Sequence, residues 1–213
     1  TPSLTVLMAV RNGSEYLRTA VESILQQSYG DFQFLIVDDE STDKTRQILR
    51  STVDPRIRLI CLEKNVGQTA ALNVGLRQAV APWIARMDAD DVSHPSRLKE
   101  QMSALRENPS VGCVGTAIWE FCEDPAVREK VIVRPPDHES IRRAVLHGSG
   151  MIHGSIVVRR EALLACGAYD ERYRYASDRE MFIRLLRRVR GMNLQEPLLG
   201  VRRHASQDSF SWT

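Results

Sequence analysis

Short apolar runs alternate with helical segments through the first half of the chain, and this alternation limits the folds that the chain can adopt. Four runs have the length of buried strands, at residues 4–10, 32–37, 57–62 and 83–87. Between the first two, Leu17, Ala20, Val21 and Ile24 recur at the spacing of one helix face. Buried strands joined by helices build a mostly parallel sheet flanked by helices. The pattern therefore predicts an α/β fold with a Rossmann-like central sheet.

The second half of the sequence is less regular. We expect strands at 111–120, 155–158 and 198–201, and a helix at 178–189. Near the start of the chain, Asn12 and Glu15 have the spacing of a capping box for the first helix. No repeat or linker divides the sequence, so we predict a single domain, residues 1–213, with one half at about 1–92 and the other at about 93–213.

The composition excludes several classes of protein. The 213 residues are 43% hydrophobic and 26% charged, which excludes a disordered chain. The 29 Lys and Arg against 27 Asp and Glu give a net charge of +2, too balanced for a protein held to nucleic acid by bulk charge. No window approaches the ~20 apolar residues of a membrane span. The four cysteines have no CxxC spacing, which favours unpaired thiols in a reducing compartment and hence the cytoplasm.

Two clusters of carboxylates follow the second and fourth predicted strands. They contain Asp38, Asp39, Glu40 and Asp43, and then Asp88, Asp90 and Asp91. Open α/β sheets bind their ligands at the carboxyl ends of the strands. Clustered carboxylates stay ionised together when a cation offsets their repulsion, and oxygen ligands suit Mg²⁺ or Mn²⁺ bridged to phosphates. The clusters therefore predict a metal and diphosphate site, with solvated loop carboxylates as the alternative.

The second acidic cluster is also compatible with two other enzymes. The segment Asp88-Ala89-Asp90-Asp91-Val92 fits the DxDxV pattern of haloacid-dehalogenase-type phosphatases, in which the first Asp is the nucleophile. That pattern normally lies near the start of the domain, whereas four strands precede it here. A nucleotidyltransferase would need a glycine-rich phosphate loop after the first strand, and Arg11-Asn12-Gly13-Ser14 is not one. Both alternatives stay open on the residues alone.

A series of motifs, in order along about residues 4–209, resembles the family 2 glycosyltransferases of the GT-A fold. In the first half these are Ala9-Val10-Arg11-Asn12, Val37-Asp38-Asp39-Glu40-Ser41-Thr42-Asp43, Asn65-Val66-Gly67 with Asn73-Val74-Gly75, and Met87-Asp88-Ala89-Asp90-Asp91. In the second half they are His153-Gly154-Ser155, Gly167-Ala168-Tyr169-Asp170, Ser177-Asp178-Arg179-Glu180, and Arg202-Arg203-His204 with Ser206 and Ser209. The chain departs from the family pattern at Ala9, Leu72 and Ser177, where Pro, Arg and Glu are usual.

The resemblance implies which residues bind the donor and the metal. Asp39 would accept a hydrogen bond from the nucleobase, with Asp38 supporting the pocket and Arg11 beside it. Asp88 would lie near the ribose, and Asp90 would hold Mg²⁺ or Mn²⁺ on the diphosphate. The implied nucleotide-sugar-binding residues are Arg11, Asp38, Asp39, Asn65, Gly67, Asp88 and Arg202, and the implied metal ligands are Asp90, Asp88 and His204. A solvated basic strand is the alternative for Arg202, and a surface histidine is the alternative for His204.

The same resemblance implies a general base in the second half. Asp178 would take the proton of the acceptor hydroxyl as its oxygen attacks the anomeric carbon, which inverts the anomeric configuration. An Asp also suits the first turn of a helix, and the two roles are compatible. His153 would line the acceptor side, and a buried histidine without that role is the alternative.

The implied activity is an inverting, metal-dependent transfer of a sugar from a nucleotide-diphosphate donor, UDP-type by preference, to a hydroxyl of a glycan or lipid-linked saccharide. Bacterial surface polysaccharide synthesis is the implied context, and no nucleic-acid partner is expected. Arg187, Arg188 and Arg190 would face either solvent or the anionic inner face of the plasma membrane, with peripheral association in the second case. A catalytically idle nucleotide-sugar-binding module is the alternative from another class.

Overall fold

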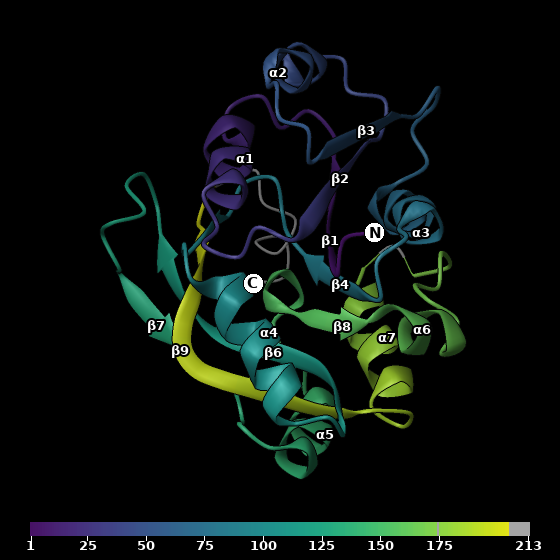
Figure 1. Ribbon diagram of the computed structural model, residues 1–213, viewed down its shortest axis with the longest axis vertical. Helices are drawn as coiled ribbons and strands as arrows, with labels where there is room; N and C mark the ends of the chain where they lie inside the picture. The colour runs from purple at the N-terminus through teal and green to yellow at the C-terminus, as the bar shows by residue number, and fades with distance from the viewer. Residues whose placement is uncertain (174, 205–213) are drawn as a thin grey trace.

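The chain folds around one curled sheet with helices against its faces (Figure 1). The computed structural model describes residues 1–173 and 175–204. Ser206 and Ser209 of the terminal motif lie outside the described residues. The predicted α/β class is confirmed.

The first half forms the parallel part of the sheet. Its strands are β1 (Leu4–Val10), β2 (Phe32–Asp38), β3 (Ile57–Cys61) and β4 (Trp83–Arg86). They lie in the order β3-β2-β1-β4, and each neighbouring pair is parallel. Their connections contain α1 (Leu17–Leu25), α2 (Thr45–Ser51) and α3 (Gln68–Gln78). The four predicted strands are confirmed to within one residue at each end.

Strand β1 is buried along its whole length and joins the cores on the two faces of the sheet. Its side chains alternate between the faces. Val6 and Met8 pack in the core that contains α1, whereas Leu7 packs in the core that contains α3. Gly75 allows this second contact, because a Cβ at position 75 would clash with the side chain of Leu7. Burial on both faces explains why the apolar runs form central strands.

The second half extends the sheet with strands of both directions. These strands are β5 (Val92–Ser93), β6 (Val111–Phe121), β7 (Lys130–Ile132), β8 (Val157–Arg159) and β9 (Arg190–Arg202). The full order is β3-β2-β1-β4-β8-β6-β9-β5, and β7 pairs with β6. Strands β6 and β9 are parallel, whereas β8 is antiparallel to both β4 and β6. The helices of this half are α4 (Arg97–Glu107), α5 (His138–Val145), α6 (Arg160–Ala165) and α7 (Ser177–Leu185).

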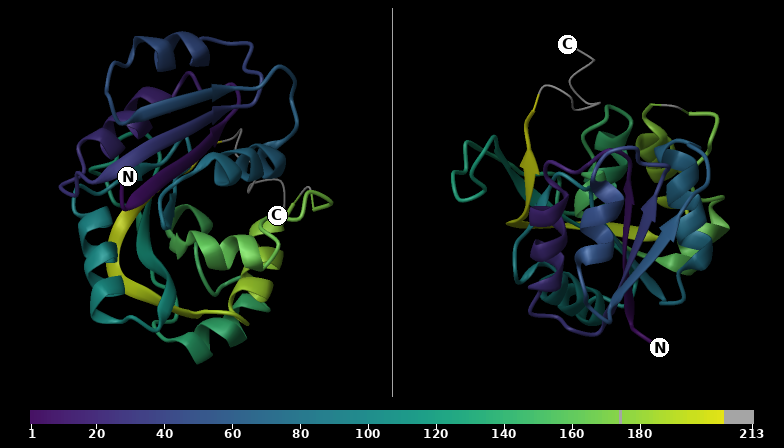
Figure 2. Two further views of the ribbon diagram at one scale, coloured as in Figure 1. Left: turned by 45° about the vertical axis from the view of Figure 1, so that its right-hand side comes forward. Right: turned by 90° about the horizontal axis from the view of Figure 1, so that it is seen from above.

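The last strand is much longer than predicted. The sequence indicates a strand at 198–201, whereas β9 runs for 13 residues. Pro197 and its polar neighbours interrupt the apolar pattern, and the register between β9 and β6 shifts next to Ala117 at the same place. Such irregularities bend a strand, and β9 follows a curved path around the second half (Figure 2).

The structure corrects three other local predictions. Asn12 does not cap α1, because its side chain accepts a hydrogen bond from the Thr42 backbone N–H at 2.8 Å. A 3₁₀ turn at His153–Ser155 delays β8, so the strand predicted at 155–158 begins at Val157. Helix α7 ends at Leu185 rather than near 189. Each of these depends on contacts between loops, which local spacing does not reveal.

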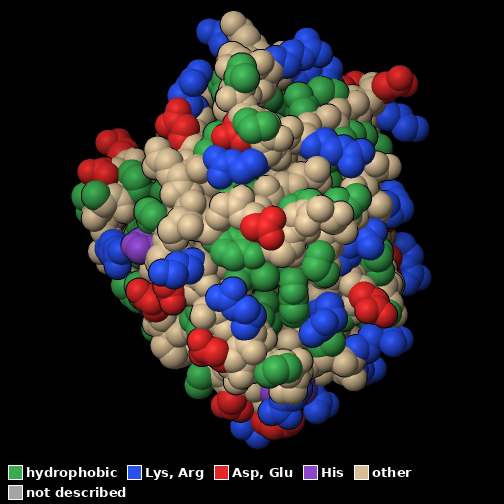
Figure 3. Space-filling model, in the orientation of Figure 1, with side chains coloured by type: hydrophobic (Ala, Val, Ile, Leu, Met, Phe, Trp, Pro, Cys, Tyr) green, Lys and Arg blue, Asp and Glu red, His purple; other side chains and the backbone are tan. Residues whose placement is uncertain are grey.

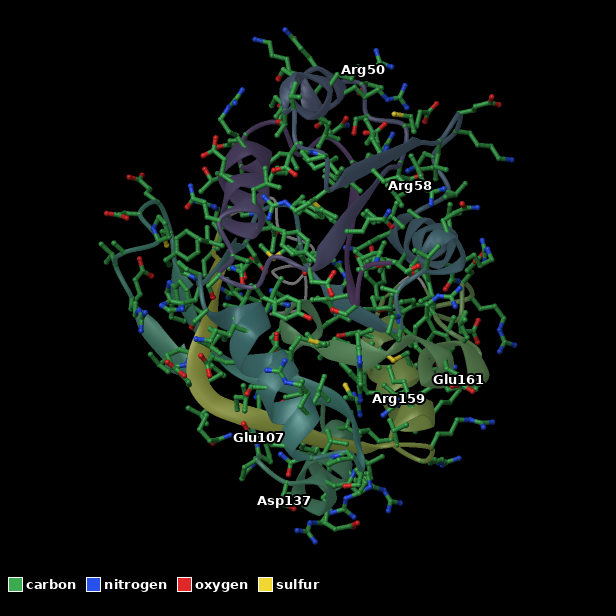
Figure 4. All side chains as sticks on the ribbon, in the orientation of Figure 1. Arg50, Arg58, Glu107, Asp137, Arg159 and Glu161 are labelled. Carbon is green, nitrogen blue, oxygen red and sulfur yellow. The ribbon has the colours of Figure 1, made fainter. Side chains whose placement is uncertain are left out.

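Many charged side chains lie on the surface of the molecule. On the face seen in Figure 3, acidic and basic side chains are interspersed. In Figure 4, Arg50 of α2, Glu107 of α4 and Asp137 point outward, and Asp137 caps α5 by accepting from the Ser140 N–H. The four cysteines are unpaired, two of them buried. Within the described ranges, no helix is both long and apolar enough to cross a membrane.

Candidate active site

Two adjoining cavities open at the carboxyl ends of β1, β2 and β4. The first has a volume of about 670 Å³ and is lined by Asp88, Asp90, His153 and His204, among others. The second has a volume of about 610 Å³ and contains Asp39. Both are lined by Ala9, Val10, Arg11 and Gln68, so they meet where β1 ends. The structure therefore brings both predicted acidic clusters to one edge of the sheet.

Asp39 organises the wall of the second cavity. Its side chain is 2% exposed. One carboxylate oxygen accepts from the Val66 N–H at 2.8 Å, and the other accepts from Asn65 Nδ2 at 2.7 Å and the Gly67 N–H at 2.9 Å. Gly67 has φ 87°, which favours glycine. Asp39, Asn65 and Gly67 thus form one unit at the start of α3.

Asp38 lies behind this wall and lines neither cavity. Its side chain is fully buried, and one carboxylate oxygen accepts from Arg46 Nε at 2.5 Å. Arg46 also donates to the Leu62 carbonyl at 2.9 Å, which links the loops after β2 and β3. Arg11 is exposed at the junction of the two cavities. The predicted supporting place of Asp38 fits this geometry.

Three carboxylates crowd the loop after β4. Asp88 and Asp91 both face Gly154, where a Cβ would come within 3.1 Å of Asp88 Oδ2 and 3.3 Å of Asp91 Oδ2. Burial and the negative charge of Asp88 raise the pKa of Asp90, and the same causes raise the pKa of Asp91 well above its usual range. Burial also opposes ionisation of Asp88, but the Arg86 guanidinium and the other basic neighbours together outweigh it and lower the pKa of Asp88. Repulsion between the three groups is therefore incompletely balanced by the protein.

Two buried arginines lie beneath these carboxylates. Arg86 is 1% exposed and donates to Asp88 Oδ1 at 2.5 Å. Arg97 is fully buried and donates to the Arg86 carbonyl at 2.7 Å and to Gln101 Oε1 at 3.1 Å. Burial lowers the pKa of Arg97 to about 10, which still leaves it charged at neutral pH. The positive charges of Arg86 and Arg97 thus lie next to the three carboxylates of the loop after β4 and partly offset their negative charge.

His204 reaches the second acidic cluster from the end of β9. Its Nε2 lies 3.0 Å from Asp90 Oδ2, and its ring lies 5.0 Å from the ring of Tyr16. Within residues 1–173 and 175–204, no three His, Cys, Asp or Glu side chains are arranged to hold a metal on their own. A carboxylate and an imidazole with crowded acidic neighbours still suit a divalent ion whose other ligands are phosphates and water. The residues present therefore fit such an ion, with Asp90 and His204 as ligands.

Arg202 holds the backbone around the acidic loop. Its side chain is 5% exposed and lies between the rings of Tyr16 and Phe121, at 4.4 and 4.6 Å from their centroids. Nε donates to the Asp90 carbonyl at 3.1 Å, and Nη1 donates to the carbonyls of residues 122 and 123. The Arg202 N–H donates to Asp91 Oδ1 at 3.1 Å. This placement favours a positioning role over the direct contact with the nucleotide sugar that the resemblance implies.

His153 connects the first cavity with the start of α7. Its Nε2 lies 2.7 Å from the Tyr169 hydroxyl, and its ring packs edge-on to Phe182 of α7. Asp178, in the first turn of α7, is half-buried and close enough to interact electrostatically with both His153 and Tyr169. Asp178 itself lies outside the lining of the two described cavities. The predicted base thus lies near His153 without lining either cavity.

We expect His153 to make stability fall in mild acid. Burial and the nearby Arg86 charge lower the pKa of His153 from 6.5 to about 4. Between these values the unfolded chain binds the proton and the folded chain does not, so stability is present above pH 6.5 and lost as pH falls toward 4. The loss is on the order of 3 kcal/mol. Urea unfolding at pH 7 and pH 5, in wild type and His153→Gln, measures it; equal pH dependence in both would contradict the assignment.

Sequence reasoning missed several residues of this site. Gln68 lines both cavities, and its Nε2 lies 3.5 Å from Asp88 Oδ1. Its place directly after Gly67, at the start of α3, was the available signal. Tyr16 carried no such signal, because its contacts with Arg202 and His204 join the two ends of the chain.

Comparison with known proteins identifies the family. Residues 5–167 match the model of glycosyl transferase family 2. The chain is 32% identical to EpsE of Bacillus subtilis over 207 residues, which cover 94% of this chain and 73% of that protein. It is 29% identical to the O-antigen biosynthesis glycosyltransferase WbnJ of Escherichia coli over 212 residues, with 94% and 80% covered.

Solved structures agree at the level of the fold. The S. aureus TarS fragment in complex with UDP-GlcNAc superposes with a TM-score of 0.81 at 18% identity, over 99% of this chain. The mannosyltransferase PcManGT from Pyrobaculum calidifontis, in complex with GDP-Man and Mn²⁺, gives 0.73 at 19% identity, also over 99%. The chain spans 61% and 59% of those two solved chains. The chain therefore belongs to glycosyl transferase family 2 and is a glycosyltransferase with the GT-A fold.

Proposed function

We propose that this glycosyltransferase moves a sugar from a nucleotide-diphosphate donor, UDP-type by preference, to a hydroxyl of a glycan or lipid-linked saccharide with inversion. The observation that carries the proposal is the pair of adjoining cavities. One contains the Asp90 and His204 side chains, and the other contains Asp39 with the start of α3. A nucleotide sugar has two matching ends, a base and a diphosphate-linked sugar. The proposal takes residues 1–92 as the donor half and 93–213 as the acceptor half.

Donor binding is proposed to span both cavities. Asp39, Asn65 and Gly67 would receive the nucleobase, Arg11 would lie at the junction, and Asp88 would lie near the ribose. The preference for a UDP-type donor is supported by TarS, whose solved structures contain UDP and UDP-GlcNAc. PcManGT was solved with GDP-Man, so a purine donor is the main competitor.

The diphosphate is proposed to bind with Mg²⁺ or Mn²⁺ at Asp90 and His204, beside Asp88. The ion, when bound, would stabilise the negative charge on the departing nucleoside diphosphate. Asp90 Oδ2 and His204 Nε2, which lie 3.0 Å apart, would turn from each other toward the ion. The Mn²⁺ in the PcManGT structure supports a divalent cofactor.

Arg202→Lys is expected to weaken Mn²⁺ binding in the presence of UDP by about tenfold, within the range for residues that orient metal ligands. Lysine keeps the charge but cannot donate at once to the Asp90 carbonyl and to the carbonyls of residues 122 and 123. Titration calorimetry with Mn²⁺ measures the change. Arg203→Lys is the control, since Arg203 pairs with Glu120 at 3.7 Å instead. Unchanged Mn²⁺ affinity in Arg202→Lys would contradict the proposal that Arg202 positions the acidic loop.

The acceptor hydroxyl is proposed to lose its proton to Asp178 as its oxygen attacks the anomeric carbon. Direct displacement with one base inverts that carbon. His153 is neutral at physiological pH, as its lowered pKa implies, and would bind the acceptor side of the first cavity. WbnJ is named for O-antigen biosynthesis and ExoO of Rhizobium meliloti for succinoglycan biosynthesis. These names support a role in surface polysaccharide assembly. The proposal places that role in the cytoplasm, with peripheral binding to the inner membrane face for a lipid-linked acceptor.

A thermal-shift screen with UDP-, GDP-, dTDP- and CMP-sugars, with and without Mn²⁺, tests the proposal. We expect a UDP-sugar at 100 times its Kd to raise Tm by roughly 5–10 °C, and only with the metal. No metal-dependent shift with any donor would overturn the proposal. Turnover of a phosphomonoester without donor hydrolysis would instead support a phosphatase that uses Asp88 and Asp90. Donor binding without transfer to any hydroxyl acceptor would indicate an idle binding module.

A further inference from the structure

Residues of the loop between α6 and α7 line the second cavity. Glu171, Tyr173 and Tyr175 share this lining with Asp39 and the start of α3. The two tyrosine side chains are each 44% exposed, although most large apolar and aromatic side chains of the chain are buried. They are the aromatic residues of that lining. A ligand that binds in this polar cavity would explain why the two aromatic rings are exposed there.

The loop is fixed to α3 on both sides of the tyrosines. On one side, Asn73 Nδ2 donates to the Tyr169 carbonyl and to Glu171 Oε1, both at 2.8 Å, and Asn73 Oδ1 accepts from the Tyr169 N–H at 3.1 Å. Asn73 is 5% exposed, so these bonds are shielded from water. On the other side, Thr69 Oγ1 lies 3.3 Å from Ser177 Oγ. The loop is therefore held against the same helix whose start Asp39 organises.

We propose that Tyr173 and Tyr175 form an aromatic wall that stacks on the nucleobase of the donor. This inference rests on the proposed function. The same cavity contains hydrogen-bonding groups at residues 39, 65 and 67 and the partly exposed Val66 side chain. A flat base in this cavity would contact polar groups at its edge and rings or apolar atoms on its faces. In this arrangement the edge contacts select the base, and the tyrosines add affinity for any base.

The wall is assigned to the base rather than to a sugar by its position. The groups that fit the diphosphate end, Asp90 and His204, line the other cavity. The tyrosines share their cavity with Asp39 and are absent from the described lining of the first one. Stacking of a base on an aromatic side chain changes affinity by about tenfold or more per base. Loss of the rings should therefore weaken nucleotide binding without touching the metal.

The test compares UDP with pyrophosphate, a probe that lacks the base, by titration calorimetry in saturating Mn²⁺. Tyr173→Ala with Tyr175→Ala is expected to weaken UDP binding at least tenfold and to leave pyrophosphate binding within twofold of wild type. The matched variants Tyr173→Phe with Tyr175→Phe keep both rings and are expected to bind UDP as wild type does. Because both side chains are exposed, the thermal midpoint of each variant serves as the check on folding.

Three results would overturn the inference and leave the proposed function in place. UDP affinity that is unchanged in the alanine variant would show that the rings do not contact the base, while leaving the proposed donor in place. An equal loss for UDP and pyrophosphate would mean that the loop acts on the diphosphate end. An increase in acceptor KM with unchanged UDP affinity would assign the tyrosines to the acceptor. A fourth result would remove the proposed function together with the inference: wild-type protein that binds none of the nucleotides in Mn²⁺. This result differs from the first three because it is seen without any substitution.

Discussion

Asp178→Asn is expected to lower kcat for sugar transfer by about a thousand-fold while leaving UDP binding unchanged. General-base catalysis contributes factors of this size, and Asn keeps the shape of Asp without accepting a proton. Asp39, Asn65 and Asp88, which are proposed to bind the donor, lie on the first half of the chain, whereas Asp178 lies in the first turn of α7. The loss should therefore appear in kcat and not in the Kd for UDP. Single-turnover transfer with saturating donor and acceptor measures it.

Glu180→Gln is the matched control for this variant. Glu180 lies in the same helical turn, but its carboxylate pairs with Arg184 at 2.5 Å, and Arg184 donates to the Ala168 carbonyl. We expect Glu180→Gln to lower stability slightly and to leave kcat within a fewfold of wild type. Transfer that persists undiminished in Asp178→Asn would show that another group takes the proton.

Arg97→Leu is expected to lower the free energy of unfolding by about 3–5 kcal/mol, the size of effect found when one partner of a buried charge network is removed. The variant would leave the Arg86 carbonyl and Gln101 Oε1 without their donor inside the protein. It would also remove positive charge that favours ionised Asp88 and Asp91, because Arg97 interacts electrostatically with both. Urea unfolding without metal measures the change.

Arg106→Leu, in the last turn of the same helix, controls for the loss of an arginine from α4. Arg106 is exposed, so its replacement is expected to change stability by less than about 0.5 kcal/mol. Equal stabilities of the two variants would mean that the buried guanidinium is not a support of the acidic loop.

The first half of the fold and the place of the site were predictable because burial dictates both. Strands β1, β2 and β4 are short apolar runs that are stable when buried in the centre of a sheet. Parallel strands have their carboxyl ends at one edge of the sheet. Asp39 follows β2 directly, and Asp90 lies in the loop after β4. Their association with two adjoining cavities therefore follows from local pattern and sheet direction alone.

The second half could not be predicted to the same degree because its geometry depends on distant partners. Strand β9 contains Pro197 in its middle, so its sequence indicates only the strand at 198–201, and pairing with β6 extends the strand back to Arg190. The resemblance implies that Arg202 binds the nucleotide sugar. In the structure, Tyr16 and Phe121 come from elsewhere in the chain and enclose its side chain. Loop positions such as Tyr173 have no periodicity that would have marked them.

The curved strand β9 also has a consequence for hybrid enzymes. The continuous stretch from α7 through β9 begins with the turn that contains Asp178 and ends next to His204. A chimera joined in the loop before Ser177 would thus inherit the proposed base and the proposed metal ligand as one piece of chain. The recipient must then supply a compatible β6, since β9 pairs with it from Val111 to Phe121. Exchange of acceptor preference between relatives is best attempted with β6 and the α7–β9 stretch transferred together.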